Sequence, residues 1–193
     1  MIKVSVDATA AEPVSLSEIT EHARIDSTSE DAYISALISV ARANAENKTH
    51  RLLRPGAVSM TMDSFRPVEL LSPLRETSVM SIQYVDSTGG VSLVDTTVYE
   101  IHDDSDTRPA LLTTAYGQTW PSVQNVKGAV TISYLAGYTS SSPIPEPIKQ
   151  WIRLTVTGMY ENRTSINDPS ANAALGYQFL DGLLEPYVIH VVE

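Results

Sequence analysis

The stretch STSEDAYISALISVARANAEN, residues 27–47, decides the fold because it predicts the longest helix of the chain. Five apolar side chains in it recur at the spacing of one buried helical stripe: Ile34, Leu37, Ile38, Ala41 and Ala45. Ser27 and Glu30 stand three residues apart just before this stripe and predict a capping box. An amphipathic helix needs apolar partners to be stable. We therefore expect a helix over Thr28–Asn47 that packs against other helices.

Such partners are predicted at both ends of the chain. Ser15–Ile25 predicts a short helix that begins with a capping pair, Ser15 and Glu18. After Pro147, a second stripe predicts another long helix: Ile148, Trp151, Ile152, Thr155, Met159 and Tyr160. A last helix is expected over Ala173–Leu184, where Pro186 ends it. The N-terminal and C-terminal helices must meet, because each has a stripe to bury.

Between these helices the hydrophobic period changes from about 3.6 to 2 residues. Short alternating runs, separated by turn clusters such as Asp86–Gly90, predict strands near residues 58–62, 68–71, 79–85, 91–94, 98–102, 111–114 and 130–135. Several short strands of this kind indicate a small antiparallel sandwich or barrel.

The predicted fold class is α+β: a helical bundle core built from N- and C-terminal helices, with an inserted small antiparallel β domain. Residues 1–56 and 139–193 are assigned to the helical core with an N-terminal arm and a C-terminal tail, and residues 57–138 to the β module. In the arm, Ile2, Val4 and Val6 alternate with polar residues and predict a short strand. This strand either pairs with a neighbouring subunit or is a loosely tied end.

Charge and composition exclude several classes of protein. A net charge of −10 argues against a protein that grips DNA, although DNA can pass such a surface without adhering. The chain has no cysteine, which excludes disulfides, thiolate nucleophiles and cysteine-ligated metals. The N-terminus does not resemble a signal peptide, and no apolar run approaches the roughly 18 residues of a membrane span. We expect a soluble protein made in the cytoplasm, with no membrane partner.

Candidate catalytic groups are few. The four histidines, His22, His50, His102 and His190, are scattered through the sequence. Asp103, Asp104 and Asp106 cluster, but a calcium loop counted from Asp104 would have Pro109 and Ala115 at its glycine and closing positions. Trp120 and Trp151 are expected to be packing residues. We predict no catalytic residues, no cofactor and no metal, and hence no enzyme; the rival is a hydrolase with a carboxylate pair on the β module.

The apolar tail has two possible explanations. It comprises Tyr187, Val188, Ile189, His190, Val191 and Val192. It forms either a final strand docked on the β module or a segment that inserts into a partner.

Five segments occur in an order that resembles a known family: ALISVARANAEN (36–47), SVMSIQYVDSTGG (78–90), Trp120–Pro121, GAVTISYLAGY (128–138) and IPEPIKQWIRLTVTGMYENR (144–163). Together, from Leu16 to Arg163, the chain is similar to tailed-phage head–tail connector proteins. These are also called adaptor or head-completion proteins, and gene transfer agents use similar ones.

The resemblance implies a structural virion protein of the head–tail junction. Such proteins form a ring, typically of twelve subunits, beneath the portal protein; the ring joins the DNA-filled capsid to the stopper or tail-terminator protein and continues the DNA channel. It implies that the tail, Tyr187 to Val192, binds the portal. Ring-interface candidates are Arg42, Glu46, Arg153 and Arg163. The alternative is a tail-completion or tail-terminator protein of the same junction.

Overall fold

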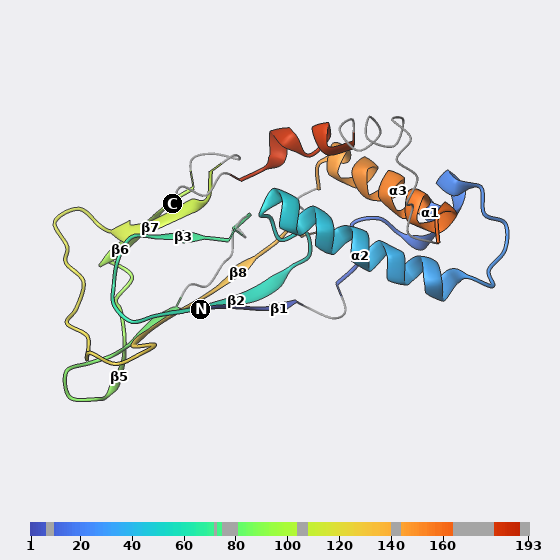
Figure 1. The fold of residues 1–193 in the computed structure, drawn as a ribbon. Helices are drawn as coiled ribbons and strands as arrows, with labels where there is room; N and C mark the ends of the chain where they lie inside the picture. Colours follow the sequence, from blue (N-terminus) through green and yellow to red (C-terminus); the bar gives the residue numbers. More distant parts are fainter. Residues whose placement is uncertain are drawn as a thin grey trace, which may run out of the picture.

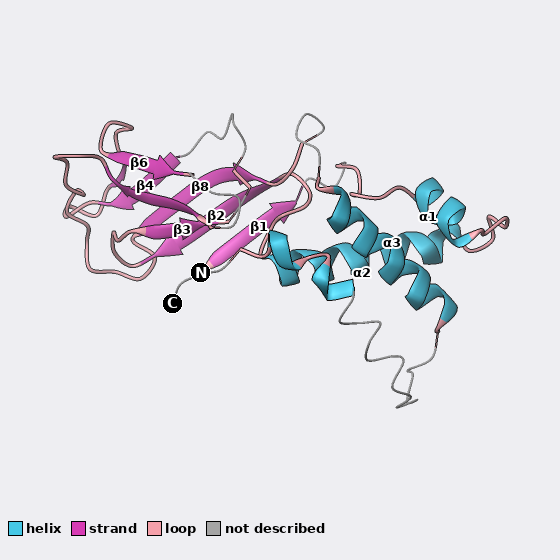
Figure 2. Cartoon of the chain, turned by 90° about the horizontal axis from the view of Figure 1, so that it is seen from above, coloured by secondary structure: helices cyan, strands magenta, loops and turns pink. Residues whose placement is uncertain are grey.

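The computed structural model describes residues 1–6, 10–71, 73–74, 81–103, 108–139, 144–163 and 180–189. Figure 1 shows an elongated molecule with the helices at one end and the strands at the other. The same separation is visible from above in Figure 2. The predicted α+β class is confirmed, with helices from both ends of the chain lying together.

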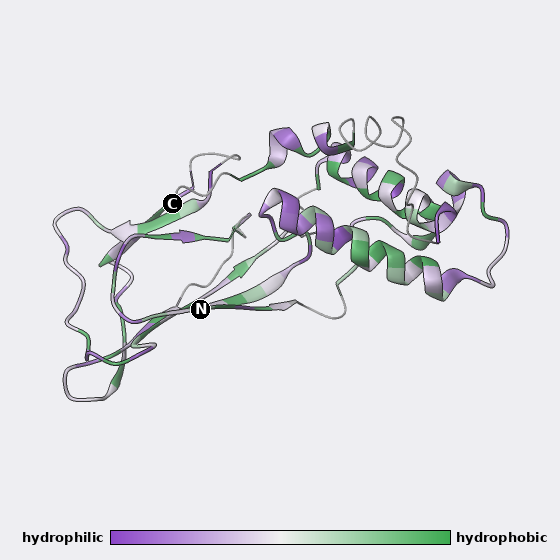
Figure 3. Cartoon of the chain, in the orientation of Figure 1, coloured by the Kyte–Doolittle hydropathy of each residue, from purple (hydrophilic) through white to green (hydrophobic). Residues whose placement is uncertain are grey.

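Among the described residues, the helical end contains α1 (Leu16–Ala23), α2 (Asp31–Thr49) and α3 (Glu146–Glu161). The predicted stripe of α2 is buried at Ile34, Ile38, Ala41 and Ala45, and Leu37 packs at its edge. It meets a stripe on α3 whose buried members are Ile148, Trp151, Ile152 and Val156. Figure 3 shows the hydrophobic middle of α2 and its hydrophilic C-terminal end. The predicted pairing of N- and C-terminal helices is confirmed.

The predicted start of α2 is wrong. Ser27 and Glu30 do not form a capping box; instead, the Ser27 hydroxyl lies 2.8 Å from the Ser29 hydroxyl, and the helix begins at Asp31. The Glu30 carboxylate accepts a hydrogen bond from the Tyr160 hydroxyl, 2.6 Å away on α3. A tertiary contact therefore takes the acidic side chain that local spacing assigned to the cap. By contrast, the capping box of Ser15 and Glu18 in α1 is present as predicted.

The strands form two antiparallel sheets. The five-stranded sheet has the order β1 (Ile2–Val6), β2 (Gly56–Met62), β8 (Val130–Ala136), β4 (Ser81–Val85), β5 (Val91–Leu93). The three-stranded sheet has the order β3 (Val68–Leu70), β7 (Ala110–Thr114), β6 (Tyr99–His102). Both sheets contribute to one apolar cluster, as in a sandwich. Trp120 is a packing residue of this module, as expected, because its ring stacks on Phe65 with centroids 4.6 Å apart.

The N-terminal arm is a strand of this chain's own sheet. β1 pairs with β2, with Ile2 opposite Met60 and Val4 opposite Val58. The range 1–56 assigned to the helical core thus includes a strand of the β module. The two cores adjoin at consecutive residues, because Leu52 belongs to the sheet cluster and Leu53 to the helical cluster.

The C-terminal chain returns to the junction between the two cores. After a helical turn at residues 180–182, the short 3-10 helix η1 (Glu185–Tyr187) leads to Ile189, which is 2% exposed. Most of the helix predicted over Ala173–Leu184 lies outside the described residues, as do His190, Val191 and Val192.

Candidate functional site

Four charged side chains connect α2 to the segment that follows β1 and to the residues just before β2. The Arg42 guanidinium on α2 lies between two carboxylates, with Nε 2.8 Å from Glu12 and NH1 2.6 Å from Glu46. Arg54, just before β2, lies 3.1 Å from the same Glu12 and donates to the carbonyl of Ala10. We call Glu12, Arg42, Glu46 and Arg54 the junction network. Their side chains are 13–23% exposed. Two ring-interface candidates, Arg42 and Glu46, therefore bind partners within their own chain.

The third ring-interface candidate, Arg153, joins α1 to α3. Its guanidinium lies 2.8 Å from Glu18 and 2.6 Å from Glu146. The Ser15 backbone N–H donates to the Glu18 carboxylate at 2.8 Å. This hydrogen bond, followed by that from Arg153, lowers the pKa of Glu18 to about 2. The carboxylate is therefore held charged, and it fixes the N-terminal end of α1 against α3.

The fourth interface candidate, Arg163, keeps a half-exposed side chain. Its guanidinium pairs with Glu30 and lies 5.0 Å and 5.1 Å from the ring centroids of Tyr33 and Tyr160. The hydrogen bond from the Tyr160 hydroxyl, and then that from Arg163, lowers the pKa of Glu30. The same hydrogen bond with Glu30 raises the pKa of Tyr160. This cluster lies on the surface, where a charged, aromatic group is available to a neighbour.

The C-terminal segment is attached to the junction at two points. The buried Arg51 donates from Nε to the carbonyl of Tyr187 at 2.7 Å, and its NH1 lies 3.3 Å from the Tyr138 hydroxyl. The Ile189 N–H donates to the Thr49 carbonyl at 3.0 Å. No local pattern in the sequence indicates the burial of Arg51, which is 6% exposed. The described part of the tail, residues 187–189, is thus docked at the C-terminal end of α2. His190, Val191 and Val192 lie outside the described residues, so the two explanations of the tail remain predictions.

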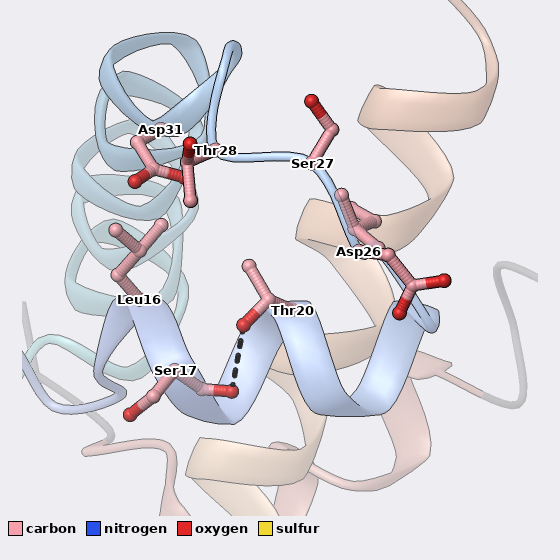
Figure 4. Close-up of a pocket in the computed structure, with 8 residues that line it drawn as sticks. Leu16, Ser17, Thr20, Asp26, Ser27, Thr28 and Asp31 are labelled. Atoms are coloured by element: carbon pink, nitrogen blue, oxygen red, sulfur yellow. Dashed lines mark hydrogen bonds between the residues drawn. The ribbon is translucent and has the colours of Figure 1, made fainter.

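The described residues contain little that suggests catalysis or ion binding. A pocket of about 220 Å³ lies beside the α1–α2 turn and is lined by Leu16, Ser17, Thr20, Ile25, Asp26, Ser27, Thr28 and Asp31. Figure 4 shows it in close-up. The Thr20 hydroxyl in this pocket donates a hydrogen bond to the Ser17 carbonyl. In the described part of the chain, no three His, Asp or Glu side chains are grouped to hold a metal ion. Asp104 and Asp106 lie outside that part. None of the described helices is long and apolar enough to cross a membrane.

Comparisons with known proteins agree with the sequence resemblance. Residues 13–83, from before α1 into β4, match the family described as "Phage gp6-like head-tail connector protein". A search of curated proteins found no match. A chain from the "Neck of empty GTA particle computed with C6 symmetry" superposes with a TM-score of 0.75 at 21% identity, over 99% of this chain and 97% of that one. Another, from the "Virion of native gene transfer agent (GTA) particle", gives 0.72 at 21% identity, over 98% and 97%.

Several ion pairs among the described residues, such as Arg42–Glu12, Arg54–Glu12 and Arg153–Glu18, join segments that are distant in the sequence. The resemblance to tailed-phage head–tail connector proteins is confirmed by the family match across α1, α2, β2 and β3. Along nearly its whole length the chain shares the fold of chains solved in gene-transfer-agent particles.

Proposed function

We propose that this chain is a structural subunit of the head–tail junction of a phage or gene transfer agent. The observation that carries the proposal is that 99% of this chain superposes on a chain of a gene-transfer-agent neck, of which 97% is covered. The connector-family match in residues 13–83 supports the same role. The protein would be made in the host cytoplasm and reside in the virion.

In this role, about twelve copies close into a ring beneath the portal and join the capsid to the stopper or tail. A related chain comes from the "Neck of native GTA particle computed with C12 symmetry", with a TM-score of 0.66 at 20% identity, over 99% of this chain and 97% of that one. A ring requires two different faces on each subunit that meet head to tail. The net charge of −10 per copy favours passage of DNA through the ring, because like charges repel.

The portal contact is proposed for the end of the chain. Tyr187 to Ile189 are held to the body through Arg51 and Thr49, so these residues fix where the tail leaves the subunit. His190, Val191 and Val192 follow directly and supply the inserting part. Arg163 is the ring candidate best placed for a neighbour, since its side chain is 51% exposed.

The test is attachment to the portal of the same particle, followed by pull-down and electron microscopy. A variant lacking residues 190–193 should fold with an unchanged melting temperature and no longer bind the portal. A variant lacking 187–193 is a poorer test, because it also removes the buried Ile189. Replacement of Arg108, far from the tail in sequence and on the β module, by Ala serves as the matched control and should bind normally. Normal portal binding without residues 190–193 would contradict the proposed tail contact; the absence of any ring or portal binding by the intact chain would contradict the connector role.

A further inference from the structure

The two outer strands of the five-stranded sheet both expose aliphatic side chains. Among the described residues, four of the nine exposed large hydrophobic side chains lie on these strands: Ile2 and Val4 on β1, and Val91 and Leu93 on β5. Val91 and Leu93 are 72% and 66% exposed. Outer strands with unpaired backbone groups are natural sites of association with another chain. Natural proteins usually protect such edges with charge, so apolar edges indicate a partner.

The two edges present opposite sides of the sheet. Ile2 and Val4 stand opposite the buried Met60 and Val58, so they continue the inner, core-facing side. Val91 and Leu93 stand opposite Val85 and Gln83, which alternate with the buried Ile82 and therefore lie on the outer side. One edge thus offers apolar groups on its inner side and the other on its outer side.

The outer side next to β5 contains no charge. Its side chains on β4 and β8 are Ser81, Gln83, Val85, Thr131, Ser133 and Leu135. An inner-side β1 edge laid over this surface would bury no unpaired charge, which is the main cost that such contacts must avoid. The surface suits an overlap of two sheets better than a simple extension of one.

The edges also differ in charge. Lys3 is the one charged side chain within β1, whereas residues 81–103 contain carboxylates and no Lys or Arg. Asp86 and Asp95 flank β5, and hydrogen bonds from Thr88 and Thr97, respectively, lower their pKa values. Both therefore stay charged near neutral pH. Lys3 alternates with Ile2 and Val4 and so lies on the other side of β1, from which its charge acts on the β5 edge at a distance. A cationic edge and an anionic edge attract each other, while two copies of either edge do not.

We propose that the β1 edge (Ile2, Lys3 and Val4) of one copy lies over the β5 edge (Val91 and Leu93, with Asp86 and Asp95) of the next copy. This inference rests on the proposed ring function and names the surfaces that close the ring. The contact is heterologous, because each copy contacts one neighbour through its β1 edge and the other neighbour through its β5 edge. Such contacts generate rings. A contact between two β1 edges would stop at two copies and oppose Lys3 to Lys3.

The contact is weak by itself. Four aliphatic side chains supply only a fraction of the roughly 800 Å² per partner that a stable interface buries. The copies therefore associate when the portal or high concentration brings them together, and dilute protein is monomeric. The experiment must accordingly use concentrated protein and rings assembled on the portal.

The chain has no cysteine, so introduced cysteines report single contacts. The double variant I2C/L93C should give, under mild oxidation, a ladder of covalent oligomers, each copy linked to the next. A link within one copy is excluded, because β1 and β5 are separated by four strand spacings, roughly 19 Å, and a disulfide needs Cα atoms within about 7 Å. Mixing I2C with L93C should give dimers, whereas neither single variant should.

Val40 provides the matched control, because it is 49% exposed on α2, close to the 54% of Ile2. The pair V40C/L93C should give no ladder. K3E should reduce the yield of the I2C/L93C ladder about two- to fivefold, as expected for one exposed charge pair.

Two results separate this inference from the connector role. Rings seen by electron microscopy without an I2C/L93C ladder would overturn the edge contact and leave the connector role intact. Dimers of L93C alone or of I2C alone would overturn it too, because they indicate contacts between like edges. If the intact chain forms neither rings nor portal complexes and the double variant gives no ladder, both proposals fail.

Discussion

Gly137 follows β8 in a conformation that only glycine adopts easily. Its φ is +96°, and a Cβ atom there would lie 2.1 Å from the Arg54 carbonyl oxygen. Two backbone segments, one before β2 and one after β8, thus approach each other where no side chain fits. This close approach lies where the helical and β cores meet.

Gly137→Ala should therefore destabilise the fold by about 3 kcal/mol or more, which urea unfolding would measure. Gly117 is the matched control, because its φ is also positive, +74°, and nothing lies within 4 Å of a Cβ there. Gly117→Ala should cost only about 1 kcal/mol from the left-handed backbone. Equal losses in the two variants would show that the contact with Arg54 can relax.

Glu18 makes the stability of the fold depend on pH in the acidic range. Its folded pKa of about 2 lies below the ordinary value of 4.5, so its charge stabilises the fold above about pH 4.5. That contribution is lost as the pH falls from about 4.5 through about 2. Because the side chain is 42% exposed, solvent weakens the effect.

Glu18→Gln should thus cost on the order of 1 kcal/mol at pH 7, typical of a lost helix cap, and nothing near pH 2. Urea unfolding at several pH values measures both. Glu21→Gln on the same helix is the control, because in the described residues Glu21 makes no side-chain hydrogen bond or ion pair. A cost for Glu18→Gln that is the same at pH 2 and pH 7 would contradict the role of its charge.

At the scale of elements, the α2–α3 contact holds the helical core. Ile152 is fully buried in it, while Leu154, two residues on, is only partly buried and lies outside the cluster. Ile152→Ala should cost about 2–5 kcal/mol in thermal or urea unfolding. Ile152→Asp should unfold the helical part. Leu154→Ala is the control and should cost less than half as much; similar costs would place the core elsewhere.

At the scale of the molecule, the junction network ties the helical core to the sheet. Arg42 binds Glu12 and Glu46 with about 15% of its side chain exposed, so removing it leaves two carboxylates close together and poorly solvated. Arg42→Ala should cost about 2–3 kcal/mol, less than the 3–5 typical of a fully buried pair. Circular dichroism follows the helices, and in a W151F background the fluorescence of Trp120 follows the β core; the two signals should then give separate unfolding curves.

The control for this prediction is the exposed pair of Lys48 and Asp181, whose side chains are about half accessible. Lys48→Ala should change stability by less than about 1 kcal/mol. If Arg42→Ala is equally mild, the network does not couple the cores.

Local patterns were sufficient for most elements. The 3.6-residue stripes of α2 and α3 and the alternation of β2 and β8 predicted their type, because the period of the apolar side chains is a property of the segment itself. Arg42 and Glu46, by contrast, were predicted only as ring-interface residues, and the structure pairs them with each other at i, i+4 spacing. Local patterns also could not predict Glu12 as the distant partner of Arg42, or Arg54 as a second cation on the same Glu12.

The sequence by itself therefore determined the kinds and order of elements, the meeting of N- and C-terminal helices, and the resemblance to connector proteins. The tertiary structure alone decided that Glu30 binds Tyr160 instead of capping α2, that Ile189 is buried against the end of α2, and that β1 joins this chain's own sheet. It also decided which strands are left as edges. The physical reason is that a polar group forms its hydrogen bond, and an apolar group packs, with whichever partner the folded chain brings near. In these cases that partner is distant in the sequence.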